Sequence, residues 1–352
     1  MLTVLSVGFP LAPISENTAG GAEHILRMLD DALIAGGHRS LVVAPEGSHC
    51  SGQLLPIPNP GRTLDANAWA RTHVHCRRII SRALEEYPVD VLHFHGIDFM
   101  AYFPKPTVPT VVTLHLAPQS FPSYALNYRA NTFFVCVSHS QAAACPKSLP
   151  VRVIENGIPT HEFRLGHKKW PYALALGRIC PEKGFHLALD AASAAGVALV
   201  IAGKVFGYPE HKKYFAEEIV PRLGKMHRFV GPVGGARKKR LLAGARCLLV
   251  PSLADETSSL VTMEALASGT PVIAFNRGAL PELVEHAHTG YLVNDIREMG
   301  AAIPRCASLR PVDCRRAAEQ RFSSKNMVAQ YFGLYEKVLS AQVSNECHEV
   351  LA

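Results

Sequence analysis

The sequence predicts an α/β protein made of two Rossmann-like domains, each a doubly wound parallel sheet, facing one another across a central cleft. Short apolar runs typical of buried strands alternate with helical patterns along most of the chain. A series of strand, loop, helix and strand starts twice, at Thr3 and at Tyr172. Between the two series, residues 160–170 lose the apolar pattern, as an interdomain linker would. A chain of 352 residues is long enough for two separate cores.

The first series begins with a strand over Thr3–Val7, a glycine-containing loop and a helix that ends at Gly36-Gly37. This order is a βαβ unit, which implies parallel strands and a right-handed crossover. Another helix is expected over 67–87. Further strands are expected at 40–44, 89–95, 108–114, 133–137 and 151–154. The loops 8–19, 45–66 and 116–130 carry no recognisable signature.

The second series has strands expected at 172–176, 198–202, 247–250, 271–275 and 291–293, with helices between them. We therefore predict a first domain over 1–162 and a second over 163–323. A final helix over 324–341 is expected to return to the first domain, followed by a loose tail over 342–352.

Composition narrows the function classes. Apolar residues make up 48% and charged residues 18% of the chain, as in a compact α/β protein. The nine cysteines include no Cys-x-x-Cys pair, which favours reduced thiols and a cytoplasmic location over a disulfide framework or a zinc site. We expect no signal peptide and no membrane span. The net charge of +7 suits ligands that carry phosphates, but aromatic residues at 8% do not interleave with the basic ones, so nucleic acid is not expected.

The most informative stretch is 251–269, which follows an apolar strand and enters a helix that Gly269 can close. A helix that starts at Ser258 or Ser259 points free backbone N–H groups and its positive dipole end above the strand, which makes an anion site. Glu256 lies before this helix and Glu264 within it. Because carboxylates do not bind anions, we expect them to bind the hydroxyls of a sugar or ribose attached to the anion.

Several ordered motifs resemble the retaining nucleotide-sugar transferases of glycosyltransferase family 4, which have the GT-B fold. The motifs are Gly20-Gly21-Ala-Glu, Gly177-Arg178-Ile-Cys-Pro-Glu-Lys183-Gly, Ala-Gly-Lys204, Gly231-Pro232-Val, and Glu256 with Glu264 running on to Gly290-Tyr-Leu-Val. The resemblance covers about Val4 to Leu339 and is more specific in the second half. Ser258-Ser259 stands where the family often has Phe-Gly, which leaves the donor sugar open.

The resemblance implies a role for each residue. Arg178 and Lys183 stabilise the diphosphate leaving group, Glu256 binds the donor sugar, Glu264 binds the ribose diol, and His115 positions the donor in the sugar pocket. Further donor contacts are expected from Gly20, Gly21, Gly177, Lys204, Gly231, Pro232, Thr257, Ser258, Ser259, Leu260 and Val261.

The predicted reaction is transfer of a hexosyl group from a nucleoside diphosphate sugar, UDP by default, to an acceptor hydroxyl by front-side displacement. No cofactor is required, and no Asp-x-Asp or histidine cluster is placed to hold a metal. The acceptor could be a saccharide, a lipid-linked glycan or a small metabolite. A nucleotide-sugar epimerase with the same fold and a non-catalytic nucleotide-sugar sensor are the alternatives.

The run Arg237-Lys238-Lys239-Arg240 enters a helix. A solvated helical face is the simpler interpretation. The other interpretation is a weak contact with an anionic membrane, which would place the protein at the inner face of that membrane.

Overall fold

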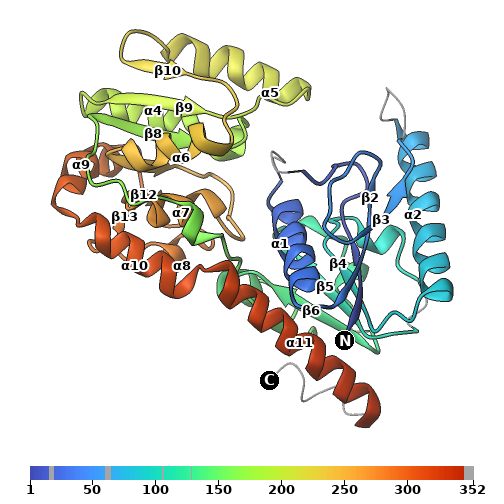
Figure 1. Ribbon diagram of the computed structural model, residues 1–352. Coiled ribbons are helices and arrows are strands. Elements are labelled where there is room, and N and C mark those ends of the chain that lie inside the picture. Colours follow the sequence, from blue (N-terminus) through green and yellow to red (C-terminus); the bar gives the residue numbers. More distant parts are fainter. Residues whose placement is uncertain (16–19, 60–64, 105–106, 128, 345–352) are drawn as a thin grey trace. The chain divides into compact units, whose positions relative to one another are not determined.

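The computed structural model describes residues 1–15, 20–59, 65–104, 107–127 and 129–344. The chain forms two compact units, the first from residues 1–155 with 327 onward and the second from 156–326. Figure 1 shows that each unit has a sheet flanked by helices. Thr18 and Ala19 of the first glycine-containing loop, and the tail from 345, lie outside the described residues.

The first unit contains a seven-stranded sheet in the order β3-β2-β1-β4-β5-β6-β7, and every neighbouring pair is parallel. Its helices are α1 (Gly21–Ala35), α2 (Ala66–Glu86) and α3 (His139–Ala143). Its strands are β1 (Thr3–Val7), β2 (Arg39–Pro45), β3 (Gln53–Ile57), β4 (Val91–Phe94), β5 (Thr110–Leu114), β6 (Thr132–Cys136) and β7 (Val151–Val153).

Successive residues of β2 pack on opposite faces of this sheet, as strand geometry requires. Leu41 and Val43 belong to the core that includes Ile80 of α2. Val42 belongs to a smaller cluster with Leu26 of α1. Both faces of the strand are therefore buried, which explains its continuous apolar sequence.

Strand β3 falls in the segment 45–66, for which the sequence predicts a loop, so that prediction is wrong. The strand lies at the edge of the sheet and is only partly buried. It also contains Pro56, which cannot donate a hydrogen bond to a ladder. An edge strand of this kind lacks the apolar signal by which buried strands are recognised.

The second unit contains a six-stranded parallel sheet in the order β10-β9-β8-β11-β12-β13. Its strands are β8 (Tyr172–Leu176), β9 (Ala198–Ala202), β10 (His227–Phe229), β11 (Cys247–Val250), β12 (Val272–Phe275) and β13 (Gly290–Val293). Its helices are α4 (Phe185–Ala194), α5 (Pro209–Tyr214), α6 (Gly235–Gly244), α7 (Leu260–Ala267), α8 (Leu280–Leu283), α9 (Ile296–Arg305) and α10 (Pro311–Arg321). The predicted fold class, two doubly wound parallel-sheet domains, is confirmed.

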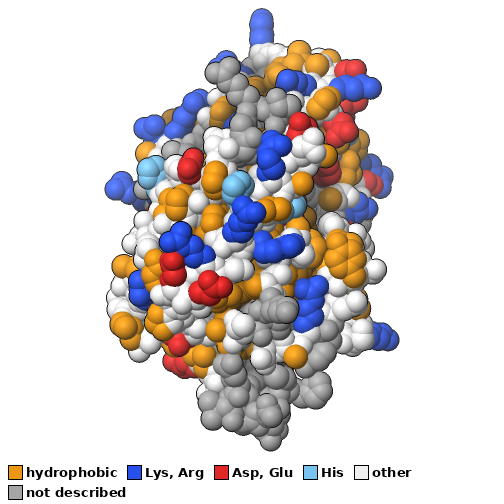
Figure 2. Space-filling view, turned by 90° about the vertical axis from the view of Figure 1, so that its right-hand side faces the viewer, with side chains coloured by type: hydrophobic (Ala, Val, Ile, Leu, Met, Phe, Trp, Pro, Cys, Tyr) orange, Lys and Arg blue, Asp and Glu red, His pale blue; other side chains and the backbone are white. Residues whose placement is uncertain are grey.

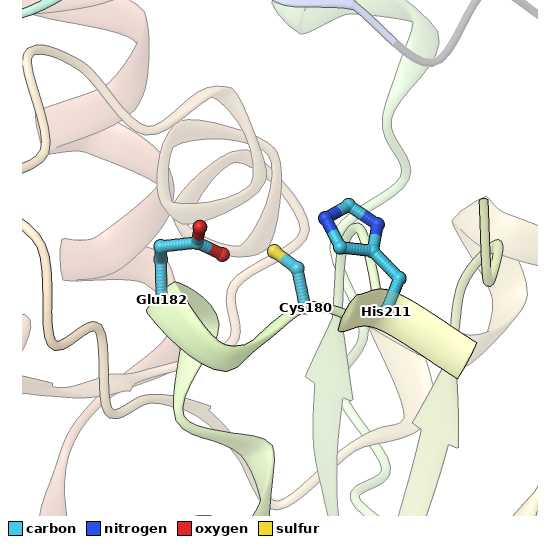
Figure 3. A group of neighbouring side chains, drawn as sticks. All are labelled: Cys180, Glu182 and His211. Carbon is cyan, nitrogen blue, oxygen red and sulfur yellow. The ribbon is translucent and has the colours of Figure 1, made fainter. Parts of the chain in front are cut away.

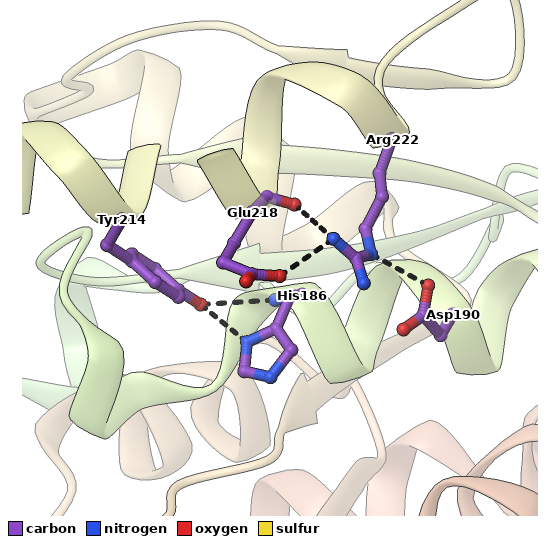
Figure 4. A network of polar contacts seen from close by, with 5 residues as sticks. All are labelled: His186, Asp190, Tyr214, Glu218 and Arg222. Atoms are coloured by element: carbon purple, nitrogen blue, oxygen red, sulfur yellow. Dashed lines mark hydrogen bonds and ion pairs between the residues drawn. The ribbon is translucent and has the colours of Figure 1, made fainter. Parts of the chain in front are cut away.

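A polar network joins α4 to the helical segment that follows α5 (Figure 4). The Arg222 guanidinium donates to Asp190 Oδ1 on α4 at 2.9 Å and to Glu218 Oε2 at 2.9 Å. The Tyr214 hydroxyl lies 2.9 Å from His186 Nδ1, again on α4. The Tyr214 contact holds the end of α5 against the start of α4, and the Arg222 contacts hold the segment after α5 against the middle of α4.

Residues 160–170, expected as a linker, belong to the second unit and pack against the rest of it. Phe163 is buried in a core cluster of that unit. The Gly166 N–H donates to the Ser268 carbonyl, and Lys169 Nζ donates to Thr270 Oγ1 at 2.6 Å. The segment lacks an apolar pattern because polar contacts, more than apolar ones, attach it.

The last helix, α11 (Ser324–Ser344), begins in the second unit and joins the first unit from Met327 onward. The Tyr335 hydroxyl lies 2.7 Å from His93 Nδ1, and the Tyr331 hydroxyl lies 3.0 Å from Thr113 Oγ1. Both tyrosines are fully buried, so these hydrogen bonds and the burial of two large rings hold α11 on the first sheet. Among the described residues, no helix has the length and apolarity that a membrane crossing requires.

Candidate functional site

The strand order of the second sheet reverses between β8 and β11, and ligands of open parallel sheets bind where the order reverses. The loops that follow these two strands, 177–184 and 251–259, are joined directly. The Leu253 N–H donates to the Glu182 carbonyl at 2.8 Å. Gly184 has a φ of +63°, and a Cβ there would lie 2.2 Å from the Pro251 carbonyl oxygen, so only glycine permits this approach.

Lys183 and Glu256, one from each loop, form an ion pair with Nζ 2.5 Å from Oε1. Their side chains are 24% and 12% exposed. The Ser252 hydroxyl also donates to Glu256, and the Ala279 N–H donates to the Glu256 carbonyl at 2.7 Å. Glu256 is therefore a positioned carboxylate at the reversal point, not a solvated loop acid.

Glu264 forms a second ion pair, with Oε1 2.6 Å from Lys238 Nζ of α6. Only 9% of Glu264 is exposed. Burial raises the pKa of this carboxyl, and the attraction of Lys238 opposes that effect. Lys238 was expected only as part of a basic run. No sequence signal identifies it as a site residue, because it lies far from Glu264 along the chain and pairs with it only after folding.

The N-terminus of α7 lies between the two carboxylates along the chain, with Ser259 at the cap position. The Ser259 hydroxyl caps no backbone N–H and instead accepts from Thr262 Oγ1 at 2.9 Å. The Ser258 hydroxyl is buried and has no hydrogen-bond partner among the described residues. Thr257 precedes these serines, and Leu260 and Val261 form the first turn. The backbone N–H groups of this turn are thus not occupied by a capping side chain and suit an anion.

Glycines follow three adjacent strands at this edge of the sheet. Gly177, Gly203 and Gly231 come after β8, β9 and β10, with φ of +157°, +159° and +71°. A Cβ at Gly203 would lie 1.7 Å from the Gly177 carbonyl oxygen, so two neighbouring strand ends approach closely. The exposed Pro232 follows Gly231. Backbone groups without side chains therefore follow the carboxyl ends of these strands, on the same edge of the sheet as the Lys183 loop.

Two cations follow two of these glycines. Arg178 is exposed, and its guanidinium forms no ion pair with any residue that the structure describes. Lys204 is also exposed, with Nζ 5.0 Å from the centre of the Phe206 ring. Arg178, Lys183 and Lys204 thus lie on the loops after the adjacent strands β8 and β9, where they can meet a phosphate.

Three of the predicted residues lie on the first unit, and the others lie on the second. His115 follows β5, with Nε2 3.1 Å from His95 Nδ1 and the two rings stacked. Burial lowers the pKa of His115 to about 4, so the imidazole is neutral at physiological pH. Gly20 caps α1, and Gly21 begins it. A Cβ at Gly20 would lie 1.8 Å from the carboxylate of Glu23, which occupies the first turn.

Cys180, Glu182 and His211 form a cluster that the sequence did not predict (Figure 3). One ligand atom from each lies within 4.8 Å of the others. The sequence predicted no metal site because these residues belong to no short ligand motif. His211 lies on α5, beyond a whole helix and strand from Cys180, so only the fold brings the three together.

The run Arg237 to Arg240 is partly engaged in ion pairs. Lys239 Nζ lies 2.6 Å from Glu162 Oε2, and Lys238 pairs with Glu264. Arg237 and Arg240 are exposed. Figure 2 shows lysine and arginine side chains interspersed with acidic and hydrophobic ones on one face of the protein. Two arginines of the run, not four cations, are thus available to a partner.

Comparison with known families decides the identity. The family described as "Glycosyl transferases group 1" matches residues 158–307, and "Glycosyltransferase Family 4" matches residues 19–162. The two matches together span most of both units. The chain belongs to glycosyltransferase family 4. It is therefore a glycosyltransferase, and the resemblance seen in the sequence is confirmed.

The relatives of this glycosyltransferase support that assignment. A phosphatidyl-myo-inositol mannosyltransferase of Mycolicibacterium smegmatis is 25% identical over 95% of this chain and 94% of its own. The structure of AviGT4, a glycosyltransferase involved in avilamycin A biosynthesis, covers 97% of this chain and 98% of its own, with 26% identity and a TM-score of 0.72. HepE of Anabaena, solved with UDP and glucose, shares the fold at a TM-score of 0.74 and 19% identity over 95% of this chain and 99% of its own. The predicted GT-B fold is confirmed.

Proposed function

We propose that this glycosyltransferase moves a hexosyl group from a nucleoside diphosphate sugar to an acceptor hydroxyl, with retention of the anomeric configuration. The observation that carries the proposal is the Lys183–Glu256 pair at the strand reversal, with Nζ and Oε1 2.5 Å apart. A cation for a leaving group and a carboxylate for sugar hydroxyls are adjacent there. The donor is proposed to be a UDP sugar, which is consistent with the UDP and glucose in the HepE structure.

The leaving group is the nucleoside diphosphate. Negative charge grows on its β-phosphate oxygen as the bond to the sugar breaks, so fixed cations stabilise the transition state more than the ground state. Arg178 is exposed and Lys183 is 24% exposed at its side chain, so both can reach a bound phosphate. The first turn of α7, from Leu260, offers N–H groups to the same diphosphate.

Each carboxylate is assigned to a pair of hydroxyls. In the free protein, Glu256 accepts from Lys183 and Ser252, and Glu264 accepts from Lys238. A carboxylate has further acceptor sites on its two oxygens, so Glu256 can take sugar hydroxyls and Glu264 the ribose diol while these contacts persist.

The transfer step is proposed as a front-side displacement. The acceptor oxygen forms a bond to the anomeric carbon on the face that the diphosphate leaves, and the acceptor proton passes to a phosphate oxygen. No base from the chain is needed for this step. His115, neutral with a pKa of about 4, is proposed to hydrogen-bond the donor sugar, and Gly20 and Gly21 to bring backbone N–H groups to the diphosphate.

The acceptor is proposed to be a hydroxyl of a saccharide, a lipid-linked glycan or a small metabolite. The relative in Mycolicibacterium smegmatis is named for a phosphatidyl-inositol acceptor. A lipid acceptor would fit a weak contact of exposed Arg237 and Arg240 with an anionic membrane surface.

A panel of nucleotides and nucleotide sugars in a thermal-shift assay tests the proposed donor. A ligand that binds only the folded protein raises its stability by mass action, about 2.7 kcal/mol at a hundred times its Kd. We expect UDP and UDP sugars to raise the melting temperature, and other nucleoside diphosphates to raise it less. A larger shift with GDP or ADP sugars would overturn the base assignment and leave the enzyme class intact.

A further inference from the structure

The cluster of Cys180, Glu182 and His211 contains three different metal-binding groups, and one ligand atom of each lies within 4.8 Å of the others. In Figure 3 the thiol lies between the carboxylate and the imidazole, and the three side chains approach one another. None of the three has a role in the proposed transfer. The cluster lies wholly within the second unit.

The histidine is buried without the hydrogen bonds that buried polar groups normally form. His211 is 8% exposed, and its Nδ1 has no hydrogen-bond partner in the part of the chain that the structure describes. Its ring packs against Phe206 and Tyr208, with ring centres 6.3 Å and 5.1 Å away. Neither ring nitrogen takes part in a hydrogen bond with a described residue. The imidazole thus packs between aromatic rings and the thiol, and one of its two ring nitrogens is buried without a hydrogen bond to a described residue (Figure 3).

The other two side chains, Cys180 and Glu182, belong to the loop 177–184 after β8, which we call the donor loop. Cys180 is buried directly before the short helical turn that carries Lys183, and its Sγ lies 3.6 Å from the Arg178 carbonyl oxygen. Glu182 is exposed, but its carbonyl accepts from the Leu253 N–H, which fixes its backbone. The carboxylate can therefore turn toward the thiol and imidazole while the backbone stays in place.

We propose that Cys180, Glu182 and His211 bind a zinc ion, which ties the donor loop 177–184 to α5. Thiolate, imidazole and carboxylate are the three ligand types that zinc takes in proteins. Ligand atoms of a tetrahedral zinc site lie about 3.5 Å apart, so the three groups need to draw together by about an ångström. The thiol loses its proton to solvent on binding, and two anionic ligands then balance the charge of Zn²⁺.

A fourth position of the ion remains open to water. The ion would take no part in bond breaking in the proposed transfer. It would restrain the loop that carries Arg178 and Lys183, since Cys180 lies between those two residues. Metal binding is independent of the donor proposal, because it depends on these three side chains and not on a nucleotide.

Cobalt substitution in the purified full chain tests this site. Co²⁺ added to the metal-free protein should give thiolate-to-cobalt charge-transfer absorption and the d–d bands of a tetrahedral ion, and Zn²⁺ should displace it. Cys180→Ser should abolish the charge-transfer band, and His211→Gln should weaken Co²⁺ and Zn²⁺ binding. Loss of an outer-shell partner alone costs 10 to 100-fold in metal affinity, so loss of a direct ligand should cost about 100-fold or more.

Matched controls separate this site from adventitious binding by other thiols and imidazoles. Cys50→Ser, at a half-buried cysteine of the first unit, and His161→Gln, at an exposed histidine, should keep the wild-type spectrum and Zn²⁺ affinity. If Cys180→Ser or His211→Gln does not fold, Glu182→Gln replaces them as the test variant, because Glu182 is exposed. This variant should also weaken Zn²⁺ binding.

Two results would overturn the proposal. One is a wild-type cobalt complex without the thiolate band, and the other is equal Zn²⁺ affinity in wild type, Glu182→Gln and the controls. The cluster would then be a thiol–carboxylate hydrogen bond beside a buried histidine.

Discussion

Replacement of Arg178 by alanine is the cleanest test of the leaving-group assignment. The side chain is exposed and forms no ion pair with a described residue, so its loss should change the free energy of unfolding by less than about 0.5 kcal/mol. Loss of a charge-stabilising donor in a transition state costs about 3 kcal/mol, or a hundredfold or more in rate. We therefore expect kcat to fall by about that factor while the melting temperature stays at the wild-type value.

The assay is transfer or donor hydrolysis with saturating nucleotide sugar, measured together with donor affinity. Arg297→Ala is the matched control, because Arg297 is also exposed and lies on α9, away from the strand reversal. Arg178→Lys should recover part of the rate, since a point charge replaces a planar fork. An Arg178→Ala enzyme with kcat within a few-fold of wild type would refute the assignment. A loss confined to KM would show that Arg178 binds ground state and transition state equally.

Three further predictions concern other parts of the chain. Glu264→Ala should weaken UDP binding by about ten to a hundredfold, as expected for a lost hydrogen bond to a charged group, and should remove discrimination between UDP and 2′-deoxy-UDP in calorimetry; retained discrimination would contradict the ribose assignment. Burial lowers the pKa of His115 from 6.5 to about 4, so in this pH range the unfolded chain takes up a proton that the folded protein does not. The free energy of unfolding should therefore fall by about 3 kcal/mol as the pH drops from 6.5 toward 4. Urea unfolding should show this loss, and it should be smaller in His115→Asn; an equal loss in both would exclude His115 as its source. Replacement of the exposed Arg237 and Arg240 by glutamate should weaken the binding free energy for anionic vesicles by about 1 kcal/mol per arginine lost, measured by cosedimentation. Undiminished binding would contradict the proposed membrane contact.

The architecture of both units could be predicted from the sequence, because their buried parallel strands are continuous apolar runs. The sequence was insufficient for β3, whose edge position and Pro56 remove that signal. The segment expected as a linker, 160–170, lacks an apolar pattern for a related reason. A segment without apolar periodicity can still be attached by polar contacts, as Lys169 is to Thr270 at 2.6 Å.

The residues of the proposed donor site also differ in how far the sequence predicts them. Local motifs predicted Arg178, Lys183, Glu256 and Glu264, because each lies within a short ordered pattern near a strand end. The partners within the site are long-range and need the fold. The Lys183–Glu256 pair spans two loops, and Lys238 reaches Glu264 from another helix. The same limit applies to the proposed zinc site, where His211 meets Cys180 only after α4 and β9 have formed.

Donor turnover by the purified protein tests the central claim most directly. UDP hexoses incubated with the enzyme in the absence of acceptor should release UDP and free sugar slowly, and proton NMR should detect the α anomer first from an α-linked donor. Arg178→Ala should lower the rate of release by about a hundredfold, and Glu256→Ala should lower it as well. Release of the β anomer would contradict retention. No turnover of any nucleotide sugar, with acceptor hydroxyls supplied, would contradict the proposed transfer chemistry itself.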